Sequence, residues 1–207
     1  MDAHTRPDFS RSALLTIDLQ RDFVSGVAGT AAVLPAVRRL ADAFRTAGRP
    51  VVHVVRLYLP DGRNADLCRR TLRGTANPYT PGSQLADGLA AGAELDPDLL
   101  LSGDAQEIGP GEHLIYKPRW SAFYGTRLLD HLTGRAVDTV VVAGCNYPNC
   151  PRATLVDATE RDLRTVAVRD AISGWTADAD REMPGMGIAC LDAAQVVTAV
   201  SPVAARP

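Results

Sequence analysis

Asp18, Lys117 and Cys150 each follow a short run of β-branched and apolar residues, a pattern typical of a buried strand. In sheets of parallel strands, ligands bind beyond the carboxyl ends of the strands. We therefore expect a carboxylate, an ammonium group and a thiol to meet at one edge of a sheet.

Cys150 has the sequence context of a nucleophile. It directly precedes Pro151, and proline is favoured in the first turn of a helix, so the thiol is expected at a helix N-terminus, where the helix dipole favours thiolate. Asp18 would act as the general base that takes the thiol proton. The alternatives are a buried structural cysteine, an aspartate that only caps a turn, and a redox-sensing thiol that Cys145 resolves.

Lys117 is the single lysine among 22 cationic residues, and the other 21 are arginines. A guanidinium keeps its protons at any working pH, whereas an ammonium can lose one when its surroundings lower its pKa. The lone lysine therefore points to proton transfer, unless it is a surface residue retained by chance.

The elements that must position these groups follow from the spacing of apolar residues. Continuous apolar runs, which suit strands covered on both faces, are Ala13–Ile17, Val51–Val55, His113–Tyr116, Thr139–Ala143, Thr165–Val168 and Gln195–Thr198. Helical stripes cover Val33–Phe44, Tyr124–Leu132, Leu155–Leu163 and Met186–Ala193. This alternation predicts one three-layer α/β domain over residues 1–207, with right-handed crossovers between parallel strands.

Residues 57–111 interrupt the alternation of strands and helices. The segment is rich in Gly, Pro, Asn and Asp, with only a weak helical pattern near Leu85–Ala91. Long loops inside compact domains are usually functional, so we expect a long loop or lid over the site.

The composition excludes several classes of partner. A formal net charge of -2 and 22% charged residues supply no basic field for nucleic acid or an anionic membrane. No apolar run approaches the length of a membrane span and residues 1–12 are polar, so we expect a cytoplasmic protein with a small-molecule partner. Four scattered cysteines are expected as reduced thiols, and the absence of histidine near Asp61 leaves no metal site or other cofactor predicted.

Four segments in this order resemble the isochorismatase-like cysteine hydrolases, across nearly the whole chain. They are Leu14–Phe23, Lys117–Phe123, Gly144–Cys150 and Arg169–Ala171. The resemblance implies a six-stranded parallel sheet in the order 3-2-1-4-5-6 and a homodimer or higher oligomer.

The same resemblance implies a role for each reactive group. Asp18 is the base, Lys117 lowers the pKa of the thiol and polarises the aspartate, and Cys150 is the nucleophile. A cis peptide bond between Cys145 and Asn146 is implied as well, which aims the amides of Asn146 and Cys150 into an oxyanion hole.

The expected reaction is hydrolysis of a C–N amide bond in a small non-peptide substrate, through an acyl-thioester. The thiol argues against hydrolysis of isochorismate, and the missing Asp-x-His after the second strand makes nicotinamide a weaker candidate. The run from Cys145 to Arg152 is similar to a subgroup that includes streptothricin hydrolases, so a cyclic amide is one alternative. A catalytically silent binding protein on the same fold is another.

Aromatic side chains close in sequence to the three reactive groups are candidate walls of a substrate pocket. They are Phe23, Trp120, Phe123 and Tyr147. Three arginines, Arg56, Arg119 and Arg152, are left open between binding a substrate carboxylate and lying in solvent.

Overall fold

The computed structural model describes residues 2–71, 74–90 and 92–201. Its centre is a seven-stranded sheet in the order β3-β4-β2-β1-β5-β6-β7. The strands are β1 (Ser12–Ile17), β2 (Val51–Val55), β3 (Gln106–Gly109), β4 (Glu112–Tyr116), β5 (Thr139–Gly144), β6 (Arg164–Ile172) and β7 (Ala189–Leu191). Six of them are parallel in the predicted order, and β3 adds an antiparallel strand at one edge.

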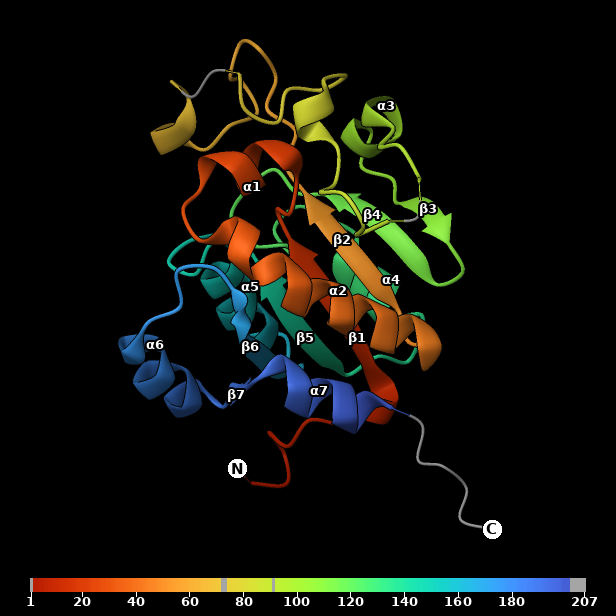
Figure 1. Cartoon of the computed structure of the whole chain (residues 1–207), viewed down its shortest axis with the longest axis vertical. Helices are drawn as coiled ribbons and strands as arrows, with labels where there is room; N and C mark the ends of the chain where they lie inside the picture. The colour runs from red at the N-terminus through yellow and green to blue at the C-terminus, as the bar shows by residue number, and fades with distance from the viewer. Residues whose placement is uncertain (1, 72–73, 91, 202–207) are drawn as a thin grey trace.

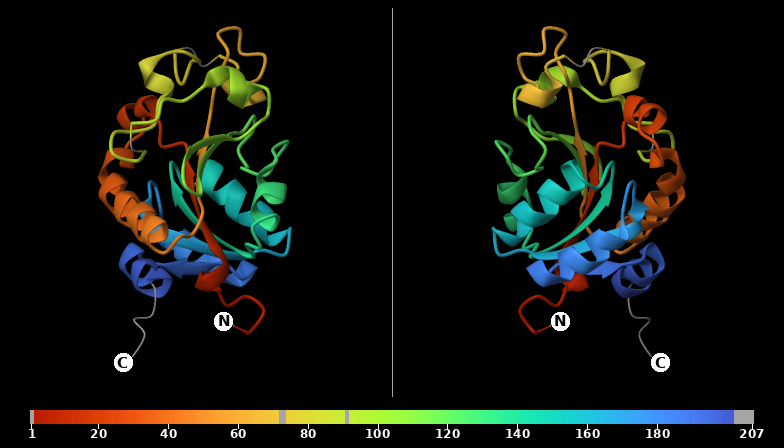
Figure 2. Two further views of the ribbon diagram at one scale, coloured as in Figure 1. Left: turned by 90° about the vertical axis from the view of Figure 1, so that its right-hand side faces the viewer. Right: turned by 90° about the vertical axis from the view of Figure 1, so that its left-hand side faces the viewer.

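Helices cover both faces of the sheet (Figures 1 and 2). On one face lie α1 (Arg21–Gly26), α2 (Thr30–Thr46) and α7 (Ala193–Val200), and on the other α4 (Leu128–Thr133), α5 (Cys150–Thr159) and α6 (Ala177–Glu182). Strand β1 serves both layers, because Leu14 packs into the first and Leu15 and Ile17 into the second. The predicted three-layer α/β architecture is confirmed.

The third predicted helix is present as α5, and the predicted stripe over Val33–Phe44 lies inside α2, where Val37, Leu40 and Phe44 are fully buried. Helix α4 begins only at Leu128, four residues after the first residue of its predicted stripe.

The last strand and helix were predicted in the wrong order. Gln195–Thr198 lies in α7, and the predicted helix Met186–Ala193 instead contains β7, which pairs with β6. The helix starts at a capping box, in which the side chains of Asp192 and Gln195 each accept from the other's backbone amide. A short apolar run fits a strand or a helix equally, and the capping box was the signal that distinguished them.

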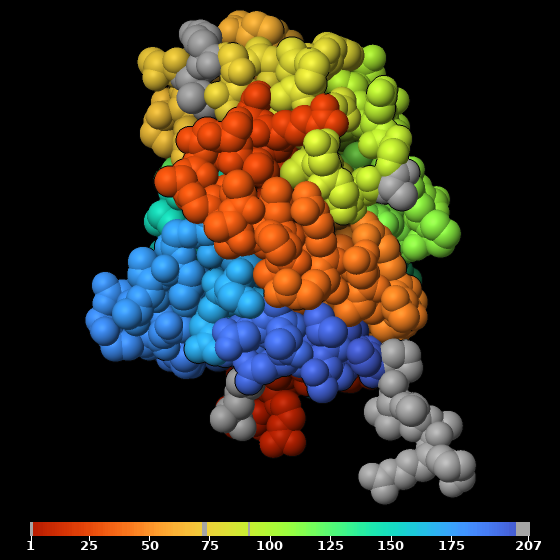
Figure 3. Space-filling view, viewed as in Figure 1, coloured from red at the N-terminus to blue at the C-terminus, as the bar shows by residue number. Residues whose placement is uncertain are grey.

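Residues 57–71 and 74–83 lie beyond the carboxyl ends of the parallel strands, at the end of the molecule opposite the N-terminus, and the turn at 81–83 packs against α1 (Figures 1 and 3). Residues 106–109 return to the edge of the sheet beside β4. The segment 57–111 contains β3, helix α3 (Pro97–Leu101) and the 3-10 turns η2 (Leu67–Arg69) and η3 (Pro81–Ser83); two further 3-10 turns, η1 (Phe9–Arg11) and η4 (Met183–Met186), lie elsewhere. Residues 85–90 form no helix, and Leu85 instead bridges to Gln20. Ala91 lies outside the described residues.

Two side chains near the start of α1 fasten this segment. The Gln20 amide donates to the carbonyls of Arg56 and Ser83, both at 2.7 Å, and Asp22 accepts from the Ala76 amide at 2.6 Å. The lid function of residues 57–111 and the single domain over residues 1–207 stay predictions.

Among the described residues, no helix combines the length and the apolar character needed to cross a bilayer.

Candidate active site

Asp18 is positioned by the close pairing of β1 with β5. Ile17 lies opposite Gly144, and the Cys145 amide donates to the Ile17 carbonyl at 2.9 Å. A Cβ on Gly144 would lie 2.2 Å from that carbonyl oxygen, and Gly144 has a φ of 130°, so only glycine fits there. Asp18 itself turns away from the strand with a φ of 53°, an uncommon value for a residue with a side chain.

Lys117 reaches Asp18 from β4, two strands away. The Lys117 amide donates to the Val55 carbonyl at 3.0 Å, and its Nζ donates to Asp18 Oδ2 at 2.9 Å. The Lys117 side chain is fully buried and that of Asp18 is 5% exposed. The lone lysine is therefore not a surface residue retained by chance. Burying an ammonium is costly, and its ion pair with Asp18 offsets that cost.

Cys150 is the first residue of α5, with its side chain against the same carboxylate. Burial raises the pKa of the Cys150 thiol, and the charge of Asp18 raises that pKa further. The charges of Lys117 and Arg56 act in the opposite direction without prevailing. Lys117 therefore lowers the pKa of the thiol, as the resemblance implied, but burial and the charge of Asp18 outweigh it, so the net shift favours the protonated thiol. The effect of the helix terminus stays a prediction.

A cavity of about 120 Å³ brings the candidate residues together. Its lining includes five predicted site residues, namely Asp18, Phe23, Cys145, Asn146 and Cys150. The other lining residues are Val27, Arg56, Tyr58, Arg69 and Asn149. Arg56 and Tyr58 follow β2 as Asp18 follows β1, so the rule that picked out Asp18 applied to them too, whereas nothing in the sequence marked Arg69.

Three predicted pocket residues lie elsewhere. Tyr147 packs edge-on against Trp175 with ring centroids 4.8 Å apart, and the Phe123 ring faces Arg161 at 5.3 Å. Trp120 lines a separate open cavity. All three belong to the apolar layer around α4 and α5, so their closeness in sequence to Lys117 or Cys150 did not place them in the cavity.

The sequence left open whether Arg56, Arg119 and Arg152 bind substrate, and of these three only Arg56 lines the cavity. The Arg56 side chain is 2% exposed, donates to the Pro118 carbonyl at 2.9 Å and pairs with Asp66 at 3.0 Å. The guanidinium of Arg119 donates to the carbonyls of Asn64 and Pro118. Arg152 does not line the cavity.

The peptide bond between Cys145 and Asn146 is trans, which corrects the predicted cis bond. A non-proline cis bond costs about 3 to 4 kcal/mol, and the positive φ of Gly144 already makes the sharp turn out of β5. Within the described residues, the backbone N–H of Asn146 donates to no acceptor. The backbone N–H of Cys150 lies in the first turn of α5, where the helix itself supplies no carbonyl to accept from it.

The second thiol of the cavity has an environment different from that of Cys150. Thr30 Oγ1 donates to Cys145 Sγ at 3.3 Å, and burial raises the pKa of Cys145 to about 11. All four cysteines are free. The redox alternative for Cys145 and Cys150 stays a prediction.

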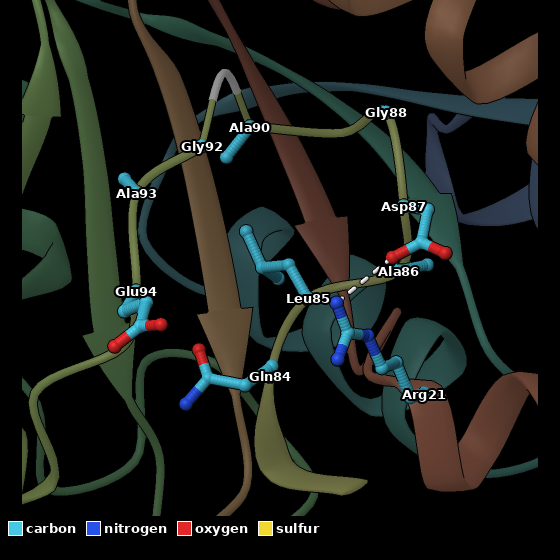
Figure 4. A pocket seen from close by; sticks show the side chains of 10 residues that line it. All are labelled: Arg21, Gln84, Leu85, Ala86, Asp87, Gly88, Ala90, Gly92, Ala93 and Glu94. Atoms are coloured by element: carbon cyan, nitrogen blue, oxygen red, sulfur yellow. Dashed lines mark hydrogen bonds and ion pairs between the residues drawn. The ribbon is translucent and has the colours of Figure 1, made fainter. Parts of the chain in front are cut away.

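Two further observations bear on ligands. Within residues 2–71, 74–90 and 92–201, no three His, Cys, Asp or Glu side chains gather as a metal site would require. A larger cavity of about 320 Å³ lies beside α1, crossed by an ion pair of 2.9 Å between Arg21 and Asp87 (Figure 4). Neither Asp18 nor Cys150 lines it.

A family model described as the isochorismatase domain matches residues 12–198. The chain belongs to the isochorismatase family. An Arabidopsis thaliana protein named as a probable inactive nicotinamidase is 34% identical over 76% of this chain and 77% of its own length. N-carbamoylsarcosine amidase of an Arthrobacter species is 31% identical over 79% of this chain, and the match spans 60% of that enzyme.

The fold agrees with a solved structure of the same family. An isochorismatase family protein from Desulfovibrio vulgaris superposes with a TM-score of 0.74 and 34% identity, covering 90% of this chain and 96% of that one.

Proposed function

We propose that this isochorismatase-family protein hydrolyses the C–N bond of a small non-peptide amide, with Cys150 as nucleophile. One observation carries the proposal: Cys150 and Asp18 line the same cavity, and Asp18 pairs with the only lysine at 2.9 Å. The similarity to an amidase supports the bond type, and a cavity of about 120 Å³ favours a small substrate.

In the proposed reaction Asp18 accepts the thiol proton while the sulfur attacks the carbonyl carbon of the amide. The amides of Asn146 and Cys150 donate to the oxyanion, and one such donor is typically worth about 2.7 to 4 kcal/mol of barrier. Asp18 then passes the proton to the leaving nitrogen, and ammonia or an amine departs. Water, deprotonated by Asp18, hydrolyses the acyl-thioester and releases a carboxylic acid.

Lys117 and the raised pKa of the thiol fit this sequence of steps. A protonated thiol beside a carboxylate loses its proton only when the substrate is in place, which protects the sulfur between turnovers. The ammonium of Lys117 holds the carboxylate of Asp18 in position and offsets the negative charge that passes to the sulfur.

Replacement of the nucleophile tests the proposal. Cys150→Ala and Cys150→Ser are expected to lower the rate of ammonia release from small amides by at least about 1,000-fold while leaving the unfolding transition in place. Cys68→Ser, at an exposed cysteine outside the cavity, is the matched control and is expected to keep full activity. Unchanged activity of Cys150→Ser would contradict the proposal.

The rival candidate is a silent binding protein, favoured by the name of the Arabidopsis relative. The paired Asp18, Lys117 and Cys150 favour catalysis instead, and no release of ammonia from primary amides, carbamoyl compounds and lactams would favour the silent protein. The lactam arm also tests the cyclic-amide alternative. We further propose the homodimer or higher oligomer that the family resemblance implies, which sedimentation equilibrium tests.

A further inference from the structure

We propose that the cavity selects amides that also carry a carboxylate, and that Arg69 binds this carboxylate. The inference rests on the proposed function and extends it from an amide bond to a class of substrate. It follows from the balance of charge around the cavity and from the place of Arg69 in the wall.

The charged side chains in and around the cavity form two ion pairs, and one further cation, Arg69, is not part of either pair. Lys117 pairs with Asp18 at 2.9 Å, and Arg56 pairs with Asp66 at 3.0 Å. The guanidinium of Arg69 has neither an ion-pair nor a hydrogen-bond partner in the part of the chain that the structure describes, although it lines the cavity. An anion bound there would meet an unpaired cation in a partly desolvated place.

Arg69 is held at the wall by its neighbours in sequence. It closes the turn η2, where its backbone amide donates to the Asp66 carbonyl at 2.8 Å. Asp66 is also the partner of Arg56, whose guanidinium lies 5.4 Å from the centre of the Tyr58 ring. Burial raises the pKa of Tyr58 to about 12, and the charges of Arg56 and Arg69 act against that rise. Arg69 is half-buried and close enough to Tyr58 to influence its ionisation.

The remaining lining fits a carboxylate together with an amide. Asp18 is the only acidic residue among those that line the cavity, and it is already paired with Lys117. Asn146 and Asn149 add neutral side-chain amides to the same wall. A volume of about 120 Å³ has room for a short chain with an amide at Cys150 and a carboxylate at Arg69.

A matched pair of substrates measures the preference. Succinamate and succinamide have the same carbon chain, but the first has a carboxylate where the second has a neutral amide; malonamate and glutaramate vary the chain length. The wild type is expected to show a kcat/KM at least about 10-fold higher for the best carboxylate substrate than for its neutral partner.

Variants of Arg69 assign the preference. Arg69→Gln is expected to raise KM for the carboxylate substrate by about 10-fold or more and to leave the neutral diamide nearly unchanged, with partial rescue in Arg69→Lys. Arg63→Gln removes an exposed cation that pairs with Asp61 in the same segment, and it is expected to change neither substrate. An equal loss for both substrates in Arg69→Gln would overturn the proposal.

Alkylation of Cys150 separates this proposal from the amidase function. Iodoacetate and iodoacetamide both react by displacement of iodide by sulfur, and they differ by one negative charge. Cys150 is expected to prefer iodoacetate relative to glutathione free in solution, and Arg69→Gln is expected to remove that preference. Glutathione is the reference because Cys68 directly precedes Arg69 in η2. A ratio independent of Arg69 overturns the carboxylate site even if amides are hydrolysed. A ratio that depends on Arg69 without any hydrolysis supports the site and contradicts the amidase.

Discussion

At the scale of single residues, the lone lysine carries the most information in this sequence. Its position after a strand and its rarity predicted a functional ammonium, and the structure buries it against Asp18. The direction of the pKa shift of Cys150 could not be predicted, because it depends on burial that no local pattern encodes. The same limit applies to Phe123 and Tyr147, since sequence closeness does not fix which layer a side chain enters.

Lys117→Arg tests whether the ammonium does more than supply charge. A guanidinium is larger and planar, so it does not fit the fully buried place of the Lys117 ammonium beside Asp18, and it cannot give up a proton. We therefore expect kcat to fall at least about 100-fold. The assay is ammonia release, with urea unfolding to verify the fold. Arg63→Lys, the reverse exchange at an exposed position, is the control. Wild-type kcat in Lys117→Arg would show that charge alone suffices.

At the scale of elements, the strands that position the site were the predictable part. Long apolar runs predicted β1, β2, β4, β5 and part of β6. Because ligands bind beyond the carboxyl ends of parallel strands, Asp18 and Cys150 were expected at one site, and both line the same cavity. Strand β7 was not predicted because its three residues form too short an apolar run to be recognised as a strand. Strand β3 failed because its residues are half exposed and it lies at an edge.

A buried network joins four elements beneath the site. His53 on β2 lies 2.7 Å from Thr16 on β1 and 2.7 Å from Glu112 on β4, and Arg45 of α2 donates to both oxygens of Glu112. Burial alone would raise the pKa of Glu112, but the hydrogen bonds from Arg45 and with His53 prevail and lower it to about 2.

This network predicts a pH dependence of stability. Because the folded pKa of Glu112 lies below its ordinary value of 4.5, its stabilisation is complete above about pH 4.5 and is lost as the pH falls toward 2. Glu112→Gln is expected to lower the free energy of unfolding by about 3 kcal/mol at pH 7 and by much less at pH 2 to 3, measured by urea unfolding. Exposed Glu160→Gln is the control. A deficit that is the same at both pH values would contradict this account.

At the scale of the whole molecule, the order of the six parallel strands followed from the family resemblance, and the chain does belong to that family. Periodicity alone predicted parallel strands without their order. The described part of residues 57–111 was the least predictable region, because its buried leucines are too widely spaced to form a repeating pattern, although they pack in one hydrophobic cluster. Single hydrogen bonds at Gln20 and Asp22 add to this packing. Arg69 comes from this region, so no pattern in the sequence marked it as a residue of the cavity.

The central claim is that Asp18, Lys117 and Cys150 form one electrostatically coupled unit, and Asp18→Asn tests it most directly. The substitution removes the negative charge that raises the pKa of Cys150, while Lys117 and Arg56 remain. The thiolate fraction at pH 7 must therefore rise, so alkylation of Cys150 by iodoacetamide should become faster, with exposed Cys68 as internal reference. Amide hydrolysis should fall at least about 100-fold in the same sample, because the base is gone. Alkylation that is slower or unchanged, or hydrolysis that persists, would contradict the account.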